Sequence, residues 1–271
     1  MSNNQEFRPV NQAHAIAEMV LFFEFLPDLS SVIPALMSLQ DELKASFPRA
    51  EKTQSFKFDL QPGPNVVSQQ VSGLQLSRFR TDGSPGWVIN INEPAISFHC
   101  MDYTRWQSIW DELRLYVTHV FQVLGAAPIT ISSVGLKYVD RFVWGGLEEN
   151  YDAKLLFKRD APLLHPRAFI SASRWHCHTG WYQQELKKEE ILHQLNIDSG
   201  RHLLSGAPAV IVNIDHTQII RSVLPDQLAK YGDLSETTAP LDELLNQLHI
   251  SNKSVLSSLL SNEMGKRINL S

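Results

Sequence analysis

The chain has 271 residues, of which 43% are hydrophobic and 20% are charged, and its formal net charge is −5. This composition excludes an intrinsically disordered chain, and the length suits one large domain or two small ones. The sequence pI of about 6.1 excludes the strongly basic footprint typical of nucleic-acid-binding proteins, although a local basic patch is compatible with that average.

Cysteine content and the absence of targeting signals indicate the compartment. Cys100 and Cys177 lie in apolar, strand-like runs without a Cys-x-x-Cys motif, so we expect buried free thiols. The polar segment from Met1 to Gln12 lacks the basic start and apolar core of a signal peptide. No uninterrupted apolar run approaches the ~18 residues of a membrane span. The sequence therefore predicts a soluble cytoplasmic protein that does not enter a membrane.

Taken in chain order, the first half predicts a lead-in, a strand, a helix and a group of strands. The lead-in is 1–15, and the strand is Glu18–Leu26. Asp28 and Ser30 are capping residues for a helix that extends to Phe47. The expected strands after it are Thr53–Leu60, Val66–Val71, Leu74–Thr81 and Trp87–Met101, the last dividing near Asn92–Pro94, with a turn at Asp82–Gly86.

An amphipathic helix ends this first half. Its apolar residues recur at helical spacing on one face, namely Trp106, Ile109, Trp110, Leu113, Val117, Val120, Phe121 and Leu124. Gly125 is a suitable C-terminal residue. Trp106 and Trp110 also suggest a stacking platform for bases, but their place on the apolar stripe favours packing in the core.

The most informative segment is the run from Ser133 to Trp144, which alternates between apolar and polar residues as a long strand does. Asp140 falls on the face that carries the large apolar side chains. An unpaired buried charge is costly, so this carboxylate needs a donor or a cation. We interpret Asp140 as a structural polar residue, and it is the one acid whose setting suggests a shifted pKa.

The second half repeats this order of elements. After the long strand we expect a short helix around Tyr151–Lys158, strands at Ala168–Tyr182, Ile191–Ile197 and Ala209–Gln218, the segment Pro225–Lys230, and a helix-rich tail from Leu241 to about Ile268. We therefore predict an α+β fold made of a duplicated strand, helix, antiparallel strands and helix unit, with helices packed on the antiparallel sheet. The expected divisions are 1–15, 16–126 and 127–271, and they are also compatible with one continuous domain.

No recognised catalytic motif is present. The sequence has no Gly-x-Ser-x-Gly elbow, no Gly-x-Gly-x-x-Gly and no phosphate-binding Gly-Lys-Ser/Thr, so we assign no catalytic residue and no cofactor. His176 and His178 share one strand face with Arg174 and are weak candidates for a Zn²⁺ site with a third ligand from elsewhere. The neighbouring cation disfavours a metal, and solvent-facing histidines are the favoured interpretation.

Cations on strands are the candidate binding residues. Lys137 and Arg141 share a strand face and lie about 13 Å apart at ~3.3 Å per residue. Arg78 and Arg80 share a face of another strand, and Arg174 lies on a third. If these strands adjoin, the cations line a basic groove for phosphates, RNA or an acidic partner surface. Ordinary solvated strand faces are the alternative.

The C-terminal segment carries two apolar stripes. Leu241, Leu244, Leu245 and Leu248 form the first, and Val255, Leu256, Leu259 and Leu260 form the second. Helices of this kind either cap the sheet or provide a face for a homo-oligomer or a partner.

Three places in the chain together resemble a known family. They are Tyr103-x-x-Trp106 after Phe98-His99-Cys100, the run Val134-Gly135-Leu136-Lys137-Tyr138-Val139-Asp140-Arg141-Phe142, and Leu248-His249 followed by Val255 and Ser261-Asn262-Glu263-Met264. They look like an uncharacterised, sporadically distributed bacterial family with the signature Val-Gly-Leu-Arg-Tyr-x-Asn-Arg-Ile. The resemblance runs from about Ala17 to Ile268, and this chain departs from the signature at Lys137, Asp140 and Phe142.

The family has no established activity, so the resemblance carries over no catalytic residue. Its patchy distribution is typical of mobile accessory genes, which include phage defence and toxin–antitoxin modules. The leading hypothesis is a non-enzymatic binding protein that engages a protein or nucleic-acid partner, and an accessory subunit of such a module is the setting that this hypothesis suggests. The alternative is an enzyme or small-ligand receptor with a site between the two halves, for which Asp140, His176 and His178 are the first candidates.

Overall fold

The computed structural model of the chain describes residues 6–11, 13–58, 67–125, 127–186, 189–204, 206–221, 228–234 and 239–270. The chain divides into two compact units. Unit 1 comprises Met1–Met19, Leu136–Ile220 and Leu244–Ser271, and unit 2 comprises Val20–Gly135 and Arg221–Glu243. Each unit is described by itself.

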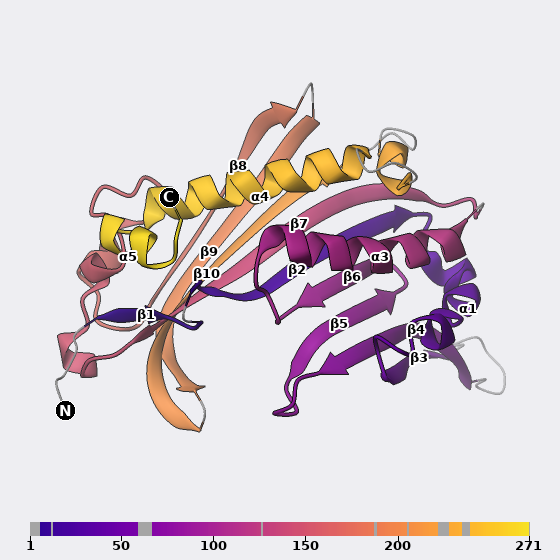
Figure 1. Cartoon of the computed structure of the whole chain (residues 1–271), viewed down its shortest axis with the longest axis horizontal. Coiled ribbons are helices and arrows are strands. Elements are labelled where there is room, and N and C mark those ends of the chain that lie inside the picture. Colours follow the sequence, from indigo (N-terminus) through magenta and orange to yellow (C-terminus); the bar gives the residue numbers. More distant parts are fainter. Residues whose placement is uncertain are drawn as a thin grey trace. The chain divides into compact units, whose positions relative to one another are not determined.

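Unit 2 holds five of the strands and one long helix, drawn from indigo to magenta in Figure 1. Its elements are β2 (Ile16–Leu26, which begins in unit 1), η1 (Leu29–Ser31), α1 (Ile33–Leu36), α2 (Leu39–Glu42), β3 (Arg49–Phe58), β4 (Val67–Phe79), β5 (Pro85–Asn92), β6 (Ala95–Cys100), α3 (Trp106–Leu124) and η5 (Ala229–Gly232).

Unit 1 holds the remaining strands and the C-terminal helices (Figure 1). Its elements are β1 (Phe7–Pro9), β7 (Thr130–Trp144, which begins in unit 2), η2 (Glu148–Asn150), η3 (Ala153–Leu155), η4 (Pro166–Phe169), β8 (Trp175–Leu186), β9 (Glu189–Leu204), β10 (Ala207–Arg221), α4 (Pro240–Leu259, which begins in unit 2) and α5 (Asn262–Arg267).

The fold is α+β, as the sequence predicts. The ten strands form one sheet in the order β3-β4-β5-β6-β2-β7-β10-β9-β8, and β1 pairs separately with β7. The pairs β1–β7, β3–β4, β4–β5, β5–β6, β8–β9 and β9–β10 are antiparallel. In the part of the chain that the structure describes, no helix is both long enough and apolar enough to cross a membrane.

The apolar stripe of α3 forms part of the core of unit 2, which confirms the interpretation of this segment as an amphipathic helix. Ile109, Trp110 and Leu113 are buried. Rings from sheet and helix meet edge to face, as in the pair Phe23–Phe121, whose centroids lie 5.1 Å apart. Trp110 and Trp106 stack on each other, and Trp110 is 5% exposed, so core packing describes it better than a platform for bases.

The helix expected between Asp28 and Phe47 is broken into three short turns, so the expectation of one continuous helix is wrong. The apolar residues at helical spacing, including Leu29, Leu36 and Phe47, are nevertheless buried. Pro34 lies in the first turn of α1, where its missing N–H is tolerated, and it therefore suits the beginning of a helix and not its interior. The serines of this segment compete with helical hydrogen bonding.

The two strands expected at 66–71 and 74–81 are one strand, β4. Thr53 pairs with Gly73, and Gln54 pairs with Val71, so Ser72 is an extra residue opposite β3. This is a β-bulge, which lets one strand continue through the two residues that separated the expected strands. A Cβ atom at position 73 would collide with the carbonyl oxygen of Ile91, which explains the glycine.

A glycine in β7 makes room for an aromatic ring of β2. A Cβ atom built on Gly135 would collide with three atoms of the Phe22 ring. The ring therefore covers the bare backbone of the glycine, an arrangement that stabilises glycine within a strand.

We expect Gly135→Ala to destabilise the protein by about 1–3 kcal/mol, because the added methyl group displaces the Phe22 ring from its place over the glycine. The measurement is the free energy of unfolding in urea. The double variant Gly135→Ala/Phe22→Ala removes the overlap, so its loss should be smaller than the sum of the two single losses. Additive losses would contradict this account of the glycine.

Candidate functional site

The strands β7, β10, β9 and β8 of unit 1 present two chemically different faces. On one face the side chains reach α4: Tyr138 Oη lies 2.9 Å from His249 Nδ1, and Gln218 Nε2 donates to the Leu248 carbonyl at 2.8 Å. Since side chains alternate along a strand, their neighbours in sequence lie on the opposite face. We call that opposite face the polar face. Its members are Lys137 and Arg141 of β7, Asn213 and Asp215 of β10, Asn196 and Asp198 of β9, and His176 and His178 of β8.

Polar contacts run across the polar face from strand to strand. Lys137 Nζ lies 2.6 Å from Asp215 Oδ2. Arg141 Nε donates to Asn213 Oδ1 at 2.9 Å, and Asn213 Nδ2 donates to Asp198 Oδ2 at 3.3 Å. The row therefore holds its cations in defined positions beside matching acceptors.

The polar face is accessible to a partner. The side chains of Lys137 and Asp215 are 32% and 24% exposed, and His176 and His178 are exposed. In the β8–β9 register His176 lies opposite Asp198, and His178 lies opposite Asn196. Partial burial makes the electrostatic attraction between Lys137 and Asp215 stronger than it would be in bulk water. The remaining exposure lets a partner contact both side chains.

Arg174 lies in unit 1 just before β8 and is exposed. Its charge acts on Glu148, which also contacts Ser173 and Arg201. These hydrogen bonds, together with the charges of Arg201 and Arg174, hold the pKa of the Glu148 carboxyl below its ordinary value. Arg174 therefore adds positive charge at the start of β8.

Arg78 belongs to unit 2 and is engaged with α3. Its Nη1 donates to Glu112 Oε1 at 2.7 Å and to the Tyr116 hydroxyl at 3.2 Å, and its guanidinium lies 5.6 Å from the centre of the Trp87 ring. A half-buried arginine held by a carboxylate, a phenol and an indole ties β4 to α3.

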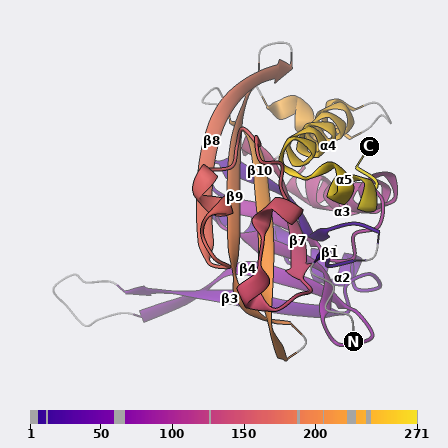
Figure 2. The same ribbon diagram turned by 90° about the vertical axis from the view of Figure 1, so that its left-hand side faces the viewer.

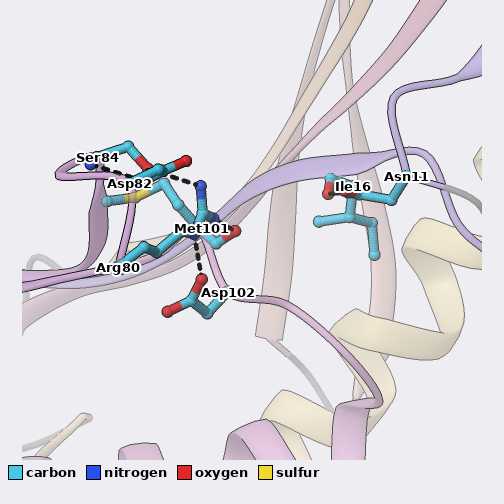
Figure 3. Close-up of polar contacts among 7 residues, drawn as sticks. All are labelled: Asn11, Ile16, Arg80, Asp82, Ser84, Met101 and Asp102. Carbon is cyan, nitrogen blue, oxygen red and sulfur yellow. Dashed lines mark hydrogen bonds and ion pairs between the residues drawn. The ribbon is translucent and has the colours of Figure 1, made fainter.

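Arg80, also in unit 2, fastens the turn between β4 and β5. Figure 3 shows its guanidinium directed toward Asp102 and the Met101 carbonyl, and Arg80 donates hydrogen bonds to both. Asp82 Oδ1 accepts from the Ser84 backbone at 2.8 Å and so orders the turn. Arg80 therefore has a local structural role. Of the predicted cations, Lys137 and Arg141 are members of the polar face of unit 1, and Arg174 precedes β8 on the same side as His176 and His178. Asn11, drawn in the same figure, donates to the Ile16 carbonyl at 2.9 Å in unit 1.

Asp140 points to the α4 side of β7, opposite the polar face. It is 2% exposed, and its Oδ1 has no hydrogen-bond partner. Burial raises the pKa of this carboxyl from 3.8 to about 7, because water can no longer solvate the charge. The expectation of a shifted pKa is thereby supported, whereas Oδ1 lacks the donor that the sequence argument required. His176 and His178 lie on the other face of the sheet, so the structure does not bring the three residues together.

A layer of stacked rings under α4 was not singled out in the sequence. The Trp181 and His193 rings stack 4.7 Å apart at 8°, and His216 stacks on His193 at 5.3 Å. His216 Nδ1 donates to Asn252 Oδ1 at 2.8 Å, so its Nε2 is free to accept from His193 Nδ1 at 3.1 Å. We call Trp181, His193, His216 and Asn252 the ring layer.

The ring layer is neutral at pH 7. Burial lowers the pKa of both His193 and His216 to about 4, and the neighbouring imidazole lowers that of His193 further. His193 Nε2 has no hydrogen-bond partner. The sequence contains one signal for this layer. His193 and His216 both fall on the apolar side of strands that alternate apolar and polar residues.

The described residues contain no group of three His, Cys, Asp or Glu side chains that could hold a metal ion. His176 and His178 have Asp198 and Asn196 as their cross-strand neighbours. Cys100 and Cys177 are free, the first buried and the second half-buried.

The chain was compared with models of protein families, with curated proteins and with solved structures, and nothing in the three comparisons matches it.

We expect Asp140→Asn to change the pH dependence of stability. The folded carboxyl holds a proton between pH 3.8 and about 7 that the unfolded chain has lost, so wild-type stability falls as pH rises through this window. The free energy of unfolding of the variant should therefore rise relative to that of wild type, by up to about 1.4 kcal/mol per pH unit from pH 4 to pH 7. Urea unfolding at intervals of one pH unit measures this. The exposed Asp160→Asn is the matched control, and parallel pH profiles for Asp140→Asn and wild type would contradict the assignment.

His193→Phe should change stability in the opposite direction with pH. A phenyl ring preserves stacking on Trp181 and removes a histidine whose folded pKa of about 4 lies below the ordinary 6.5. The unfolded wild type takes up that proton as pH falls from 6.5 to 4, so wild-type stability is lost in this window.

The variant should be less stable at pH 7, by about 1–3 kcal/mol, because His216 Nε2 loses its donor. The deficit should shrink as the pH falls to 4.5, and thermal or urea unfolding measures it. The exposed His178→Phe is the matched control, and a deficit that stays constant in His193→Phe would show that His193 does not titrate as described.

Proposed function

We propose that the protein is a non-enzymatic binding protein that engages a protein partner through the polar face of unit 1. The observation that supports this is the row Lys137–Asp215 and Arg141–Asn213–Asp198, with distances of 2.6, 2.9 and 3.3 Å. Half-exposed charges that are already held in place lose little conformational freedom on binding, and paired charges of both signs confer specificity on an interface.

Charge balance favours a protein over a nucleic acid as the partner. Binding to phosphates depends on cations that neutralise them, and the salt dependence grows with the number of such contacts. On the polar face Lys137 is paired with Asp215, and Asp198 adds a second acid. A surface with both signs matches a protein surface with the complementary pattern.

The separation of Asp140 from His176 and His178 favours binding over catalysis in unit 1. General acid–base work requires the groups to be positioned around the same reacting atoms. Asp140 is buried on the α4 side of β7, while both histidines are exposed on the polar face. We therefore place the enzyme or receptor hypothesis second.

The setting that we propose for this binding protein is an accessory subunit of a bacterial defence or toxin–antitoxin-like module. The support is the resemblance of the run from Val134 to Phe142 to a sporadically distributed family. We also propose that the two units arose by duplication of one strand and helix unit. Each has consecutive antiparallel strands and side-chain contacts from a long helix to the sheet, through Glu112 of α3 and His249 of α4.

The test is affinity purification of the tagged protein at native expression level, followed by mass spectrometry. We expect a specific protein to be recovered with wild type and to be depleted at least about fivefold with Lys137→Gln/Arg141→Gln, because neutral amides lose the charge complementarity of the polar face. The control Lys154→Gln/Lys266→Gln removes the same charge from exposed positions elsewhere in unit 1.

The proposal fails if the protein is recovered alone, or if both double variants recover the same proteins as wild type. Co-purification of nucleic acid that disappears with Lys137→Gln/Arg141→Gln would assign the polar face to a nucleic-acid partner and would overturn the choice of a protein. Both double variants should unfold at temperatures close to wild type before the comparison is made.

A further inference from the structure

Strand β8 is a long sheet edge. It runs from Trp175 to Leu186 and pairs with β9 on one side, and none of the other described strands pairs with its second side. Figure 2 shows it at the margin of the strands of unit 1. Along such an edge, alternate backbone N–H and C=O groups point away from the sheet and can pair with an added strand.

A groove lies beside this edge on the α4 side. Its volume is about 750 Å³, and its lining includes Leu163 from the segment after η3, Trp181 and Gln183 from β8, and Ile250, Ser254 and Val255 from α4. Trp181 and Gln183 are two residues apart on β8, so both point to the groove side of the strand. The side chains of an added strand would therefore enter the groove at every second residue.

Trp181 is a rigid apolar wall of the groove. Its indole lies flat on the His193 ring, which is held in turn by His216 and Asn252. An aromatic side chain that is already ordered before binding loses little entropy when a partner covers it, and tryptophan is enriched among the residues that dominate binding energy. The ring layer thus orders one side of the groove.

The other side of β8 carries one fixed cation, Arg174, and two imidazoles with N–H donors, His176 and His178. Arg174, His176 and His178 alternate with Trp175 and Cys177, and the segment from Arg174 to Gln184 contains no acidic residue. All three basic residues are exposed. Opposite charges directly across two paired strands are stabilising, and like charges are destabilising.

From these observations we propose that β8 is a docking site for an extended segment of a partner protein, which adds as a strand to the free edge and alternates apolar with acidic side chains. The apolar side chains enter the groove beside Trp181, and the acidic ones meet Arg174, His176 and His178. Backbone hydrogen bonds supply affinity, and the alternation supplies specificity. His176 and His178 are shared with the polar face, but the groove and the backbone edge of β8 are not, so this proposal stands even if Lys137 and Arg141 contact no partner.

Charge complementarity decides between this occupant and a second copy of the chain. If two β8 strands paired with each other in antiparallel fashion, residues of one side would face residues of the same side. Because the segment from Arg174 to Gln184 contains no acidic residue, Arg174 would find no carboxylate on the second copy. An acidic, extended segment supplies the carboxylates that a second copy lacks.

The test uses a fluorescein-labelled octapeptide that alternates valine and glutamate, titrated with the full-length protein at low salt by fluorescence anisotropy. We expect saturable binding at least about tenfold tighter than that of a peptide with four valines followed by four glutamates, a difference of about 1.4 kcal/mol. The same alternating peptide, N-methylated at every second residue, loses the backbone donors of one edge. One of the two N-methylation registers should abolish binding.

Variants of the protein locate the site. Ser254 is exposed and lines the groove, so Ser254→Trp fills the groove and should weaken binding of the alternating peptide at least about tenfold. The adjacent Lys253 is exposed and does not line the groove, so Lys253→Trp is the matched control. His176→Glu/His178→Glu should shift the preference from the valine–glutamate peptide to a valine–lysine peptide.

Equal binding of the alternating and blocked peptides, or full binding by Ser254→Trp, would overturn the proposal. A concentration-dependent dimer of the wild type that Ser254→Trp abolishes would assign the edge to a second copy of the chain and would also overturn it. Lys137→Gln/Arg141→Gln should leave peptide binding within about twofold of wild type, so failure of the polar face and failure of the β8 edge are separately observable.

Discussion

The alternation of side chains along β7 is the constraint on which the architecture of unit 1 depends. Tyr138, Asp140 and Phe142 are excluded from solvent on the side that faces α4, and Lys137 and Arg141 are held on the other side by acceptors of β10. A shift of register by one residue would bury the two cations and expose the aromatic rings. Because burying two cations and exposing aromatic rings would cost much free energy, the sequence of β7 fixes both the side that packs in the core and the side that stays polar.

The second constraint is the loss of hydration of the polar groups that are buried between α4 and the sheet. Helix and sheet are joined there by Tyr138–His249, Gln218–Leu248 and His216–Asn252, contacts that an aliphatic interface would not need. Burial holds the histidines neutral and raises the pKa of Asp140 to about 7, so the interface contains groups that respond to acid in opposite directions. Since a hydrogen bond requires a defined geometry, these contacts set the position of α4 along the strands more narrowly than apolar packing alone.

The same interface orders the surface beside it. Trp181 belongs both to the ring layer and to the groove at the β8 edge. A sheet edge is usually protected by charge, proline or a covering segment, because exposed backbone groups attract other strands. Arg174 gives β8 such a charge, and His176 and His178 add exposed polar rings, while the backbone of the strand stays unpaired among the described strands. A surface of this type offers no carboxylate to a second copy of itself, whereas an acidic strand supplies one, so the same residues disfavour self-association and favour the proposed partner.

Local patterns in the sequence determined the α+β class, the helix α3, the long strand β7 and the helical tail, because periodicity of 3.6 or 2 residues records which side of an element is buried. They also determined that Asp140 sits among apolar groups. They failed where short-range chemistry competed with tertiary contacts, as in the broken turns after Asp28 and the bulge at Ser72. Only the tertiary structure decided that Arg78 binds α3 while Lys137 and Arg141 pair with β10, that His193 and His216 stack, and that β8 lies at an edge. Those facts depend on which strands become neighbours, and pairing between residues far apart in the chain leaves no local period in the sequence.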